Sequence, residues 1–150
     1  MKAVLQRVLS ASVDCDGKTV SAIGRGFMVL LGVTKDDTAE EADILAAKIV
    51  GLRIFSDENG KMNLSLSDVS GEMLVVSNFT LCADCSHGRR PSFFDAQRPC
   101  EAKELYEYFI KRLKFYGVEK VGTGIFGGHM QVHIENEGPV TLILDTEDWK

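Results

Sequence analysis

The chain has 150 residues and a formal net charge of −5, with 45% hydrophobic and 26% charged residues. This composition is ordinary for a single soluble domain spanning 1–150, and no apolar run approaches the roughly 18 residues of a membrane span. The net negative charge disfavours binding along a long stretch of nucleic acid, but it does not exclude contact with a short end of an RNA. Met1-Lys2 leads into a strand pattern without a signal-peptide core, so we expect a cytoplasmic protein whose four cysteines are reduced.

Strand patterns dominate the first third of the chain. Residues 2–9 alternate loosely, and Asp16-Gly17 lies between two further runs, 12–15 and 18–23, which predicts a two-residue hairpin. Residues 27–33 are apolar throughout, as in a strand buried on both faces. The capping box Thr38-Ala39-Glu40-Glu41 then predicts a helix that ends near Gly51.

The remainder alternates further strands with one more helix. Pro99 suits the first turn of that helix, Gly117 closes it, and the 82–98 segment before it is a long loop without apolar periodicity. The predicted strands here are 52–55, 61–66, 72–81, 118–126, 129–135 and 140–145. Eight or nine strands with two helices predict a mixed α/β sheet that carries its helices on one side.

The segment Asn136-Glu137-Gly138-Pro139-Val140-Thr141 separates the last two predicted strands. Gly138 tolerates any backbone geometry, while Pro139 fixes its own φ and has no N–H to donate. Gly-Pro beside Asn usually marks a turn, so the pattern alone favours a hairpin here.

Two side-chain clusters offer candidate chemistry. Cys82, Cys85, His87 and Cys100 provide thiolates and an imidazole suited to zinc, but a second closely spaced pair is missing and unrelated cysteines are the better interpretation. The histidines His87, His129 and His133 are possible general bases. Neither His129 nor His133 has a neighbouring Ser or Asp that indicates a triad, and no G-x-S-x-G elbow is present.

Two separated motifs resemble the signature motifs of the D-aminoacyl-tRNA deacylases. They are Ser77-Asn78-Phe79-Thr80-Leu81 and Asn136-Glu137-Gly138-Pro139-Val140-Thr141. Segments 1–8, 88–93 and 123–127 agree with the family in order and spacing, so the resemblance covers essentially the whole chain. The family usually has Gln at the position of Asn78. Asn is one methylene shorter, so the resemblance implies a backbone role at this position and no particular side-chain hydrogen bond.

The resemblance implies a homodimer with a three-layer α/β/β fold of mixed, largely antiparallel sheets. It implies a cis peptide bond between Gly138 and Pro139, with this pair inserted into the partner's active site. There the two carbonyl oxygens would accept hydrogen bonds from the substrate's α-amino group. A D-side chain would point outward, an L-side chain would meet rigid backbone, and glycine would pass.

The implied reaction is hydrolysis of the ester of D-aminoacyl-tRNA and mischarged glycyl-tRNA, without metal or cofactor. Catalytic roles fall on Ser77, Asn78, Phe79 and Thr80, with backbone N–H groups near Phe79 and Thr80 polarising the carbonyl and the ribose 2′-hydroxyl helping to activate water. The Thr80 hydroxyl as nucleophile is the alternative. The implied substrate-binding residues are Asn136, Val140, Thr141, Phe126, Gly127 and Met130.

Two rival functions remain open on the sequence. One is a zinc hydrolase built on the Cys82 to Cys100 cluster. The other is a non-catalytic module that binds an RNA end or a protein through the 87–98 loop, where His87, Arg89, Arg90 and Arg98 concentrate positive charge.

Overall fold

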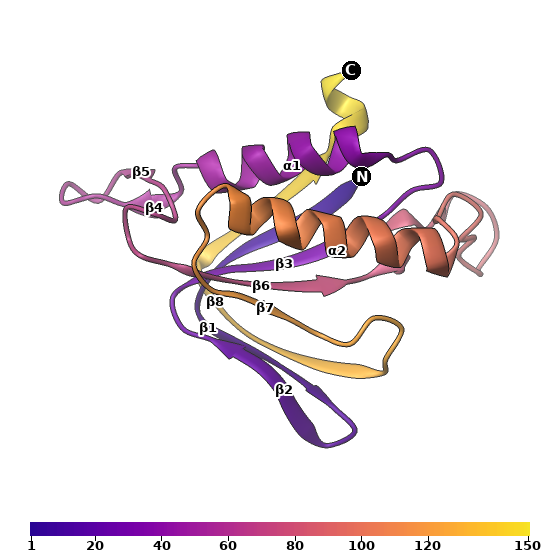
Figure 1. Cartoon of the computed structure of the whole chain (residues 1–150), viewed down its shortest axis with the longest axis horizontal. Helices are drawn as coiled ribbons and strands as arrows, with labels where there is room; N and C mark the ends of the chain where they lie inside the picture. Colours follow the sequence, from indigo (N-terminus) through magenta and orange to yellow (C-terminus); the bar gives the residue numbers. More distant parts are fainter.

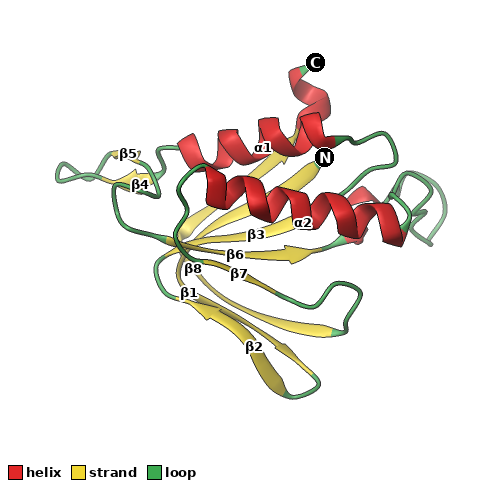
Figure 2. Ribbon diagram, viewed as in Figure 1, coloured by secondary structure: helices red, strands yellow, loops and turns green.

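The computed structural model describes residues 1–150 as one mixed sheet with two helices lying across it (Figure 1, Figure 2). The sheet runs in the order β2-β1-β3-β6-β7, and β8 pairs with β1 outside this path. Its strands are β1 (Lys2–Cys15), β2 (Lys18–Ile23), β3 (Gly26–Gly32), β6 (Glu72–Ser77), β7 (Val121–Thr123) and β8 (Met130–Asp145). A separate two-stranded ribbon contains β4 (Phe55–Ser56) and β5 (Met62–Leu64).

Strand β1 is the centre of this sheet. Its first half pairs antiparallel with β3, its second half pairs antiparallel with β2, and β8 follows it antiparallel along most of its length. Two separate strands were predicted over 2–9 and 12–15, and the structure joins them into one. Because the single long strand β1 pairs with three other strands, the sheet bends around it and is nearly closed (Figure 1).

Two apolar clusters lie on opposite faces of the sheet. The larger one packs beneath the helices and includes the fully buried Leu5, Phe27 and Phe109. The smaller one lies inside the bend and consists of Val8, Ala11, Val13, Ile23, Met28, Leu74 and Val76. The neighbours Phe27 and Met28 belong to different clusters, as the alternation of a strand requires. A mixed sheet with helices on one side is therefore confirmed.

Both predicted helices are present, α1 (Ala39–Gly51) and α2 (Pro99–Phe115). Pro99 occupies the first turn of α2, where its missing N–H costs no intrahelical bond. The helices are joined by the Arg112 to Asp43 ion pair at 2.5 Å, and Tyr108 donates to the same carboxylate. A short 3₁₀ helix, η2 (Thr146–Trp149), follows β8.

Several predicted strands are shorter in the structure. Residues 52–54 and 65–66 lie outside β4 and β5, and of 118–126 only Val121–Thr123 pair as β7. The predicted strand over 72–81 ends at Ser77 and is followed by the 3₁₀ helix η1 (Phe79–Cys82). Ile54, Leu66 and Val118 lie beyond these strands and are buried in the core without a neighbouring strand to pair with, and periodicity alone does not separate the two situations.

The predicted hairpin at Gly138-Pro139 is wrong. Residues on both sides belong to β8 and pair with β1 in one continuous antiparallel direction, Thr141 with Gln6 and Asn136 with Val8. Only Arg7 of β1 lies opposite the extra residues, so the segment is a wide bulge and the chain does not reverse. The Asn136 side chain closes it by donating to the carbonyl oxygens of Arg7 at 2.9 Å and Val140 at 3.0 Å.

The capping box of α1 makes stability depend on pH. The Thr38 hydroxyl and backbone N–H both bind the carboxylate of Glu41, and these bonds lower the Glu41 pKa to about 2. Because this pKa lies below that of the unfolded chain, the stabilisation is present above about pH 4.5 and disappears as the pH falls towards about 2.

We predict that Glu41→Gln lowers the free energy of unfolding by about 1–2 kcal/mol at neutral pH. Denaturant titrations at several pH values should show the difference from wild type shrinking as the pH falls towards 2. Glu40→Gln is the matched control, since Glu40 lies in the same turn but its exposed carboxylate makes no capping bond. Equal losses in the two variants would rule out a specific effect of the cap.

Candidate active site

A cavity of about 680 Å³ opens at the C-terminal end of β6. Its walls come from η1, the start of α2, the loop before α2, and the chain that leads into β8. Six of the site residues that the family resemblance implied line it: Ser77, Asn78, Phe79, Phe126, Gly127 and Met130. The fold thus brings the start of the first motif together with the glycine-rich segment after β7.

The end of β6 leaves two backbone N–H groups near this cavity. Asn78 donates its N–H to Leu31, and the chain then turns into η1. Phe79 and Thr80 are the first residues of that helix, and the first N–H groups of a helix have no intrahelical acceptor. The turn fits because Gly32 has no side chain; an added Cβ would lie 3.0 Å from Leu81 Cβ.

The Thr80 hydroxyl is already engaged by its neighbour. It donates to Asn78 Oδ1 at 2.5 Å, and Thr80 is not among the residues that line the cavity. No histidine, lysine or carboxylate makes a hydrogen bond with this hydroxyl. The Asn78 side chain, which is shorter than the Gln usual at this position in the family, thus stabilises the turn between β6 and η1.

Tyr106 of helix α2 connects two elements that border the cavity. Its hydroxyl donates to the carbonyl oxygen of Val75 at 2.6 Å, and its ring lies 6.0 Å from that of Phe126. Burial raises the pKa of Tyr106 to about 12, so the phenol stays neutral and remains a donor at physiological pH. Strand β6, helix α2 and the segment around Phe126 are thereby held in one arrangement.

The loop over 83–98 forms another wall, as its length suggested. Phe93 packs edge-on against Phe79 with ring centroids 5.0 Å apart. The end of the loop is tied to the chain after β3, since Gln97 donates its N–H to Val33 and its side chain to the Lys35 carbonyl. The sequence patterns predicted no role for several wall residues, among them Leu30, Val33, Gln97 and Ala102. Only their arrangement in space groups them.

The three histidines lie in different places. His129 lines the cavity. His133 lies 3.0 Å from Asp14 between β8 and β1, and His87 contacts Ser86 in the loop. None forms a nucleophile–base pair with a serine or threonine of the cavity.

The cysteine cluster does not assemble into a metal site. Cys82 is buried and its Sγ contacts the carbonyl oxygen of Val33, whereas Cys85 and Cys100 are exposed. No three His, Cys, Asp or Glu side chains come together in a group suited to a metal ion. The donor set required by the zinc hypothesis is therefore missing.

The Gly138-Pro139 segment lies away from the cavity of its own chain. Its peptide bond is cis, as the resemblance implied, and both residues are exposed. Through the register, Arg7 opposite the bulge aligns with Phe27 and Met73, whereas Ala3 aligns with Leu31 and Ser77. The bulge is therefore about 13 Å from Ser77, at the end of β6, along the strands and about 14 Å across them. Asn136, Val140 and Thr141 stay with the bulge and do not line the cavity.

Arg7 supports the bulge from beneath and is 8% exposed. It donates from Nη1 to the Ile54 carbonyl at 2.7 Å. Its Nε lies 3.1 Å from Glu137 Oε1, close enough for an ion pair although not aligned as a hydrogen bond. Gly138 has φ of 122°, and a Cβ there would lie 2.9 Å from Val140 Cγ2.

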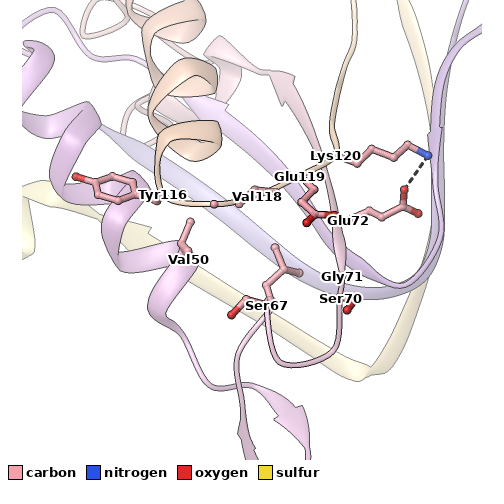
Figure 3. Close-up of a pocket in the computed structure, with 11 residues that line it drawn as sticks. Val50, Ser67, Ser70, Gly71, Glu72, Tyr116, Val118, Glu119 and Lys120 are labelled. Carbon is pink, nitrogen blue, oxygen red and sulfur yellow. Dashed lines mark ion pairs between the residues drawn. The ribbon is translucent and has the colours of Figure 1, made fainter.

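A second cavity, of about 290 Å³, lies near the other end of β6 (Figure 3). Two of its ionic groups are paired, because Lys120 points at Glu72 with 2.8 Å between Nζ and Oε2. The other Glu72 oxygen accepts the N–H of Gly24. This cavity holds no residue of either motif.

No helix in the structure combines the length and the apolar character that crossing a membrane requires.

Comparison with known proteins identifies close relatives. The family model for D-Tyr-tRNA(Tyr) deacylase matches residues 4–145. Proteins named D-aminoacyl-tRNA deacylase from Thermosipho africanus and Fervidobacterium nodosum are 57% and 58% identical over 147 residues, and both alignments cover 98% of each chain.

Two solved structures share the fold. One described as c-Myc DNA Unwinding Element Binding Protein matches with a TM-score of 0.91 and 46% identity, covering 97% of this chain and 98% of that one. A probable eukaryotic D-amino acid tRNA deacylase matches with a TM-score of 0.83 and 20% identity, covering 95% and 97%, and at this identity it shows the fold alone. On the family model and the curated relatives, the chain belongs to the D-aminoacyl-tRNA deacylases, hydrolases that act on the ester bond of aminoacyl-tRNA.

Proposed function

We propose that this protein removes D-amino acids, and glycine, from tRNA in the cytoplasm and rejects L-aminoacyl-tRNA. The observation that carries the proposal is the cavity at the end of β6, where the first motif and the segment 126–130 meet. The aminoacyl ester of the terminal adenosine would enter there, and hydrolysis would release the free amino acid and the tRNA.

The chemistry we infer uses backbone groups. The N–H groups of Phe79 and Thr80 begin η1, and they would donate to the ester carbonyl oxygen as negative charge develops on it. The 2′-hydroxyl of the substrate's ribose would help to activate the attacking water. Ser77 and Asn78 position this turn, while Phe126, Gly127 and Met130 would surround the terminal adenine. This scheme needs no side-chain base and no cofactor.

The chirality filter we propose is the bulge of a second copy. The bulge of each chain is too far from the cavity of the same chain. Gly138 and Pro139 of one subunit would therefore enter the cavity of the partner subunit. Their carbonyl oxygens would accept hydrogen bonds from the α-amino group and leave no room for an L-side chain. Asn136, Val140 and Thr141 hold the bulge in shape, since the Asn136 amide donates to Val140 and accepts from the Thr141 hydroxyl.

A homodimer is supported by the surface of β8. Its outer edge has no strand partner, and long unpaired edges favour association. Ile143 on this strand is 82% exposed, and Leu9 and Ile134 beside the bend are also exposed hydrophobic residues. We propose that two copies associate through this region, and that the bent half of the sheet forms the third layer of an α/β/β arrangement.

The decisive assay compares D-tyrosyl-tRNA, L-tyrosyl-tRNA and glycyl-tRNA as substrates. The proposal expects rapid release from the D-tyrosyl and glycyl substrates and little from the L-substrate. In Gly138→Ala a Cβ must fit at φ of 122° against Val140, so the bulge must distort. The D-to-L ratio of kcat/KM should then fall at least about tenfold, equivalent to 1.4 kcal/mol.

Gly51→Ala serves as the control, because a Cβ there meets nothing within 4 Å. Equal wild-type rates on the D- and L-substrates would refute the proposed function. An unchanged ratio in Gly138→Ala would refute only the role of the bulge.

The backbone mechanism predicts a mild effect of Thr80→Ala. Its hydroxyl contacts Asn78 and no base, so its loss should reduce kcat by about tenfold or less, the scale of one hydrogen bond. Thr80→Ser, which keeps the hydroxyl, is the companion variant. A loss of several thousandfold in Thr80→Ala with full activity in Thr80→Ser would favour the nucleophile mechanism instead.

The dimer proposal predicts that Ile143→Lys dissociates the protein, because a buried charge at a subunit contact has no partner. Sedimentation should show monomers, and deacylation should fall because the filter and the cavity come from different copies. Ile44→Lys on α1 is the matched control, since Ile44 is also an exposed isoleucine. A monomeric wild-type protein with full chiral discrimination would contradict the scheme.

A further inference from the structure

The loop over 83–98 carries charges that the proposed chemistry does not use. Arg89 and Arg90 are exposed and make no ion pair. The other basic groups near the cavity are neutralised, since Lys35 pairs with Asp95 at 2.9 Å and Arg98 with Glu101 at 2.6 Å. In a chain of net charge −5, two adjacent unpaired arginines beside the active-site cavity form a local positive site.

The end of this loop is held in place. Asp84 and Ser92 exchange two backbone hydrogen bonds of 2.8 Å, which closes the segment between them into a hairpin-like tip. Gly88 has φ of 67°, and the Asp84 side chain accepts the N–H of Ser86 within the tip. The loop lies beside the N-terminal end of α2 (Figure 1), so its tip holds the two arginines on a fixed support.

An exposed aromatic ring follows the arginines along the loop, next to a residue of the cavity wall. Phe93 lines the cavity wall, and the next residue, Phe94, is 79% exposed. The Lys35 ammonium lies 4.1 Å from the Phe94 ring centroid and covers one face of it. The opposite face is open to solvent, and Asp95 keeps Lys35 in position.

Unpaired arginines next to an exposed aromatic ring match the chemistry of single-stranded nucleic acid, in which phosphates alternate with bases that stack. An acidic protein partner would pair with the arginines but would have no use for the open aromatic face. The strand that leads to an aminoacylated terminal adenosine is single-stranded and must leave the cavity past this wall.

We propose that Arg89, Arg90 and Phe94 form a docking platform for the single-stranded 3′ end of the substrate RNA. The arginines bind phosphates, and Phe94 stacks on a base upstream of the terminal adenosine. This inference rests on the proposed function, because it takes the 680 Å³ cavity as the site of the ester. It adds the residues that distinguish a whole tRNA from an isolated aminoacyl-adenosine.

The experiment compares two substrates, D-tyrosyl-tRNA and D-tyrosyl-adenosine, which has the ester but no phosphates. The Arg89→Ala/Arg90→Ala double variant should raise KM for the tRNA about tenfold, and Phe94→Ala about fivefold. Both should leave kcat/KM for D-tyrosyl-adenosine unchanged. The salt dependence of tRNA binding should lose a slope of about 1.4, at about 0.7 for each phosphate contact.

Three control variants separate this effect from general charge and folding effects. Arg89→Lys/Arg90→Lys keeps the charge and should retain most tRNA affinity. Lys111→Ala/Lys114→Ala removes the same charge from exposed positions towards the other end of α2, and Phe115→Ala removes another exposed ring there. These last two variants should behave as wild type on both substrates.

The outcomes distinguish the two proposals. If the wild-type protein hydrolyses neither substrate, the proposed function fails and the platform fails with it. If wild type hydrolyses both and the platform variants change neither, or change both equally, only the platform is refuted. A change of oligomeric state in the platform variants, with tRNA affinity intact, would identify a contact between protein chains and would also overturn the platform.

Discussion

The interaction on which the structure most depends is the pairing of β1 with β8, and in particular the larger of its two interruptions. For most of its length this pairing is regular, but opposite Arg7 the partner strand has extra residues. A bulge of this size leaves backbone carbonyls without ladder partners, and Pro139 has no N–H to offer. The Asn136 amide fills the gap by binding Arg7 and Val140 at once. The buried Arg7 guanidinium supports the bulge through a hydrogen bond to the Ile54 carbonyl and an ion pair with the partly exposed Glu137.

The same long pairing also separates two parts of the molecule. Because β1 continues past its bulge into the bent half of the sheet, the bulge and the end of β6 occupy distant positions. Next to the cavity, Tyr106 of α2 is bound to Val75 of β6, and one cavity wall consists of loop residues tied to the chain after β3. The bulge has its own supports in Arg7 and Asn136. Each part is therefore rigid on its own, and the proposed dimer brings two rigid parts together without either having to rearrange.

Local signals in the sequence predicted local structure well. The Thr38 to Glu41 capping box, Pro99 at the start of α2 and Asp16-Gly17 between β1 and β2 all specify their elements through near neighbours, and all are present. The prediction of a hairpin at Gly138-Pro139 failed because turns and bulges favour the same residue types. What separates them is whether both flanks pair with one distant strand, and that information lies in β1. The cavity was half predictable for the same reason: the motif residues could be named, whereas Gln97, Arg98 and His129 join them only through tertiary contacts.

A site built from backbone suits the substrate range that we propose. A pocket that recognises one side chain gains affinity from contacts particular to that side chain, and each new amino acid would need a different set. Backbone acceptors instead contact the α-amino group, which all aminoacyl esters share, and the space beside them tests only the configuration at Cα. Such a filter must be stiffer than the side chains it excludes, which favours a bulge held by a buried arginine and an asparagine amide over a mobile loop. The consequence is a division between copies: the filter lies too far from its own cavity to act there, so chirality would be read only in the assembled dimer.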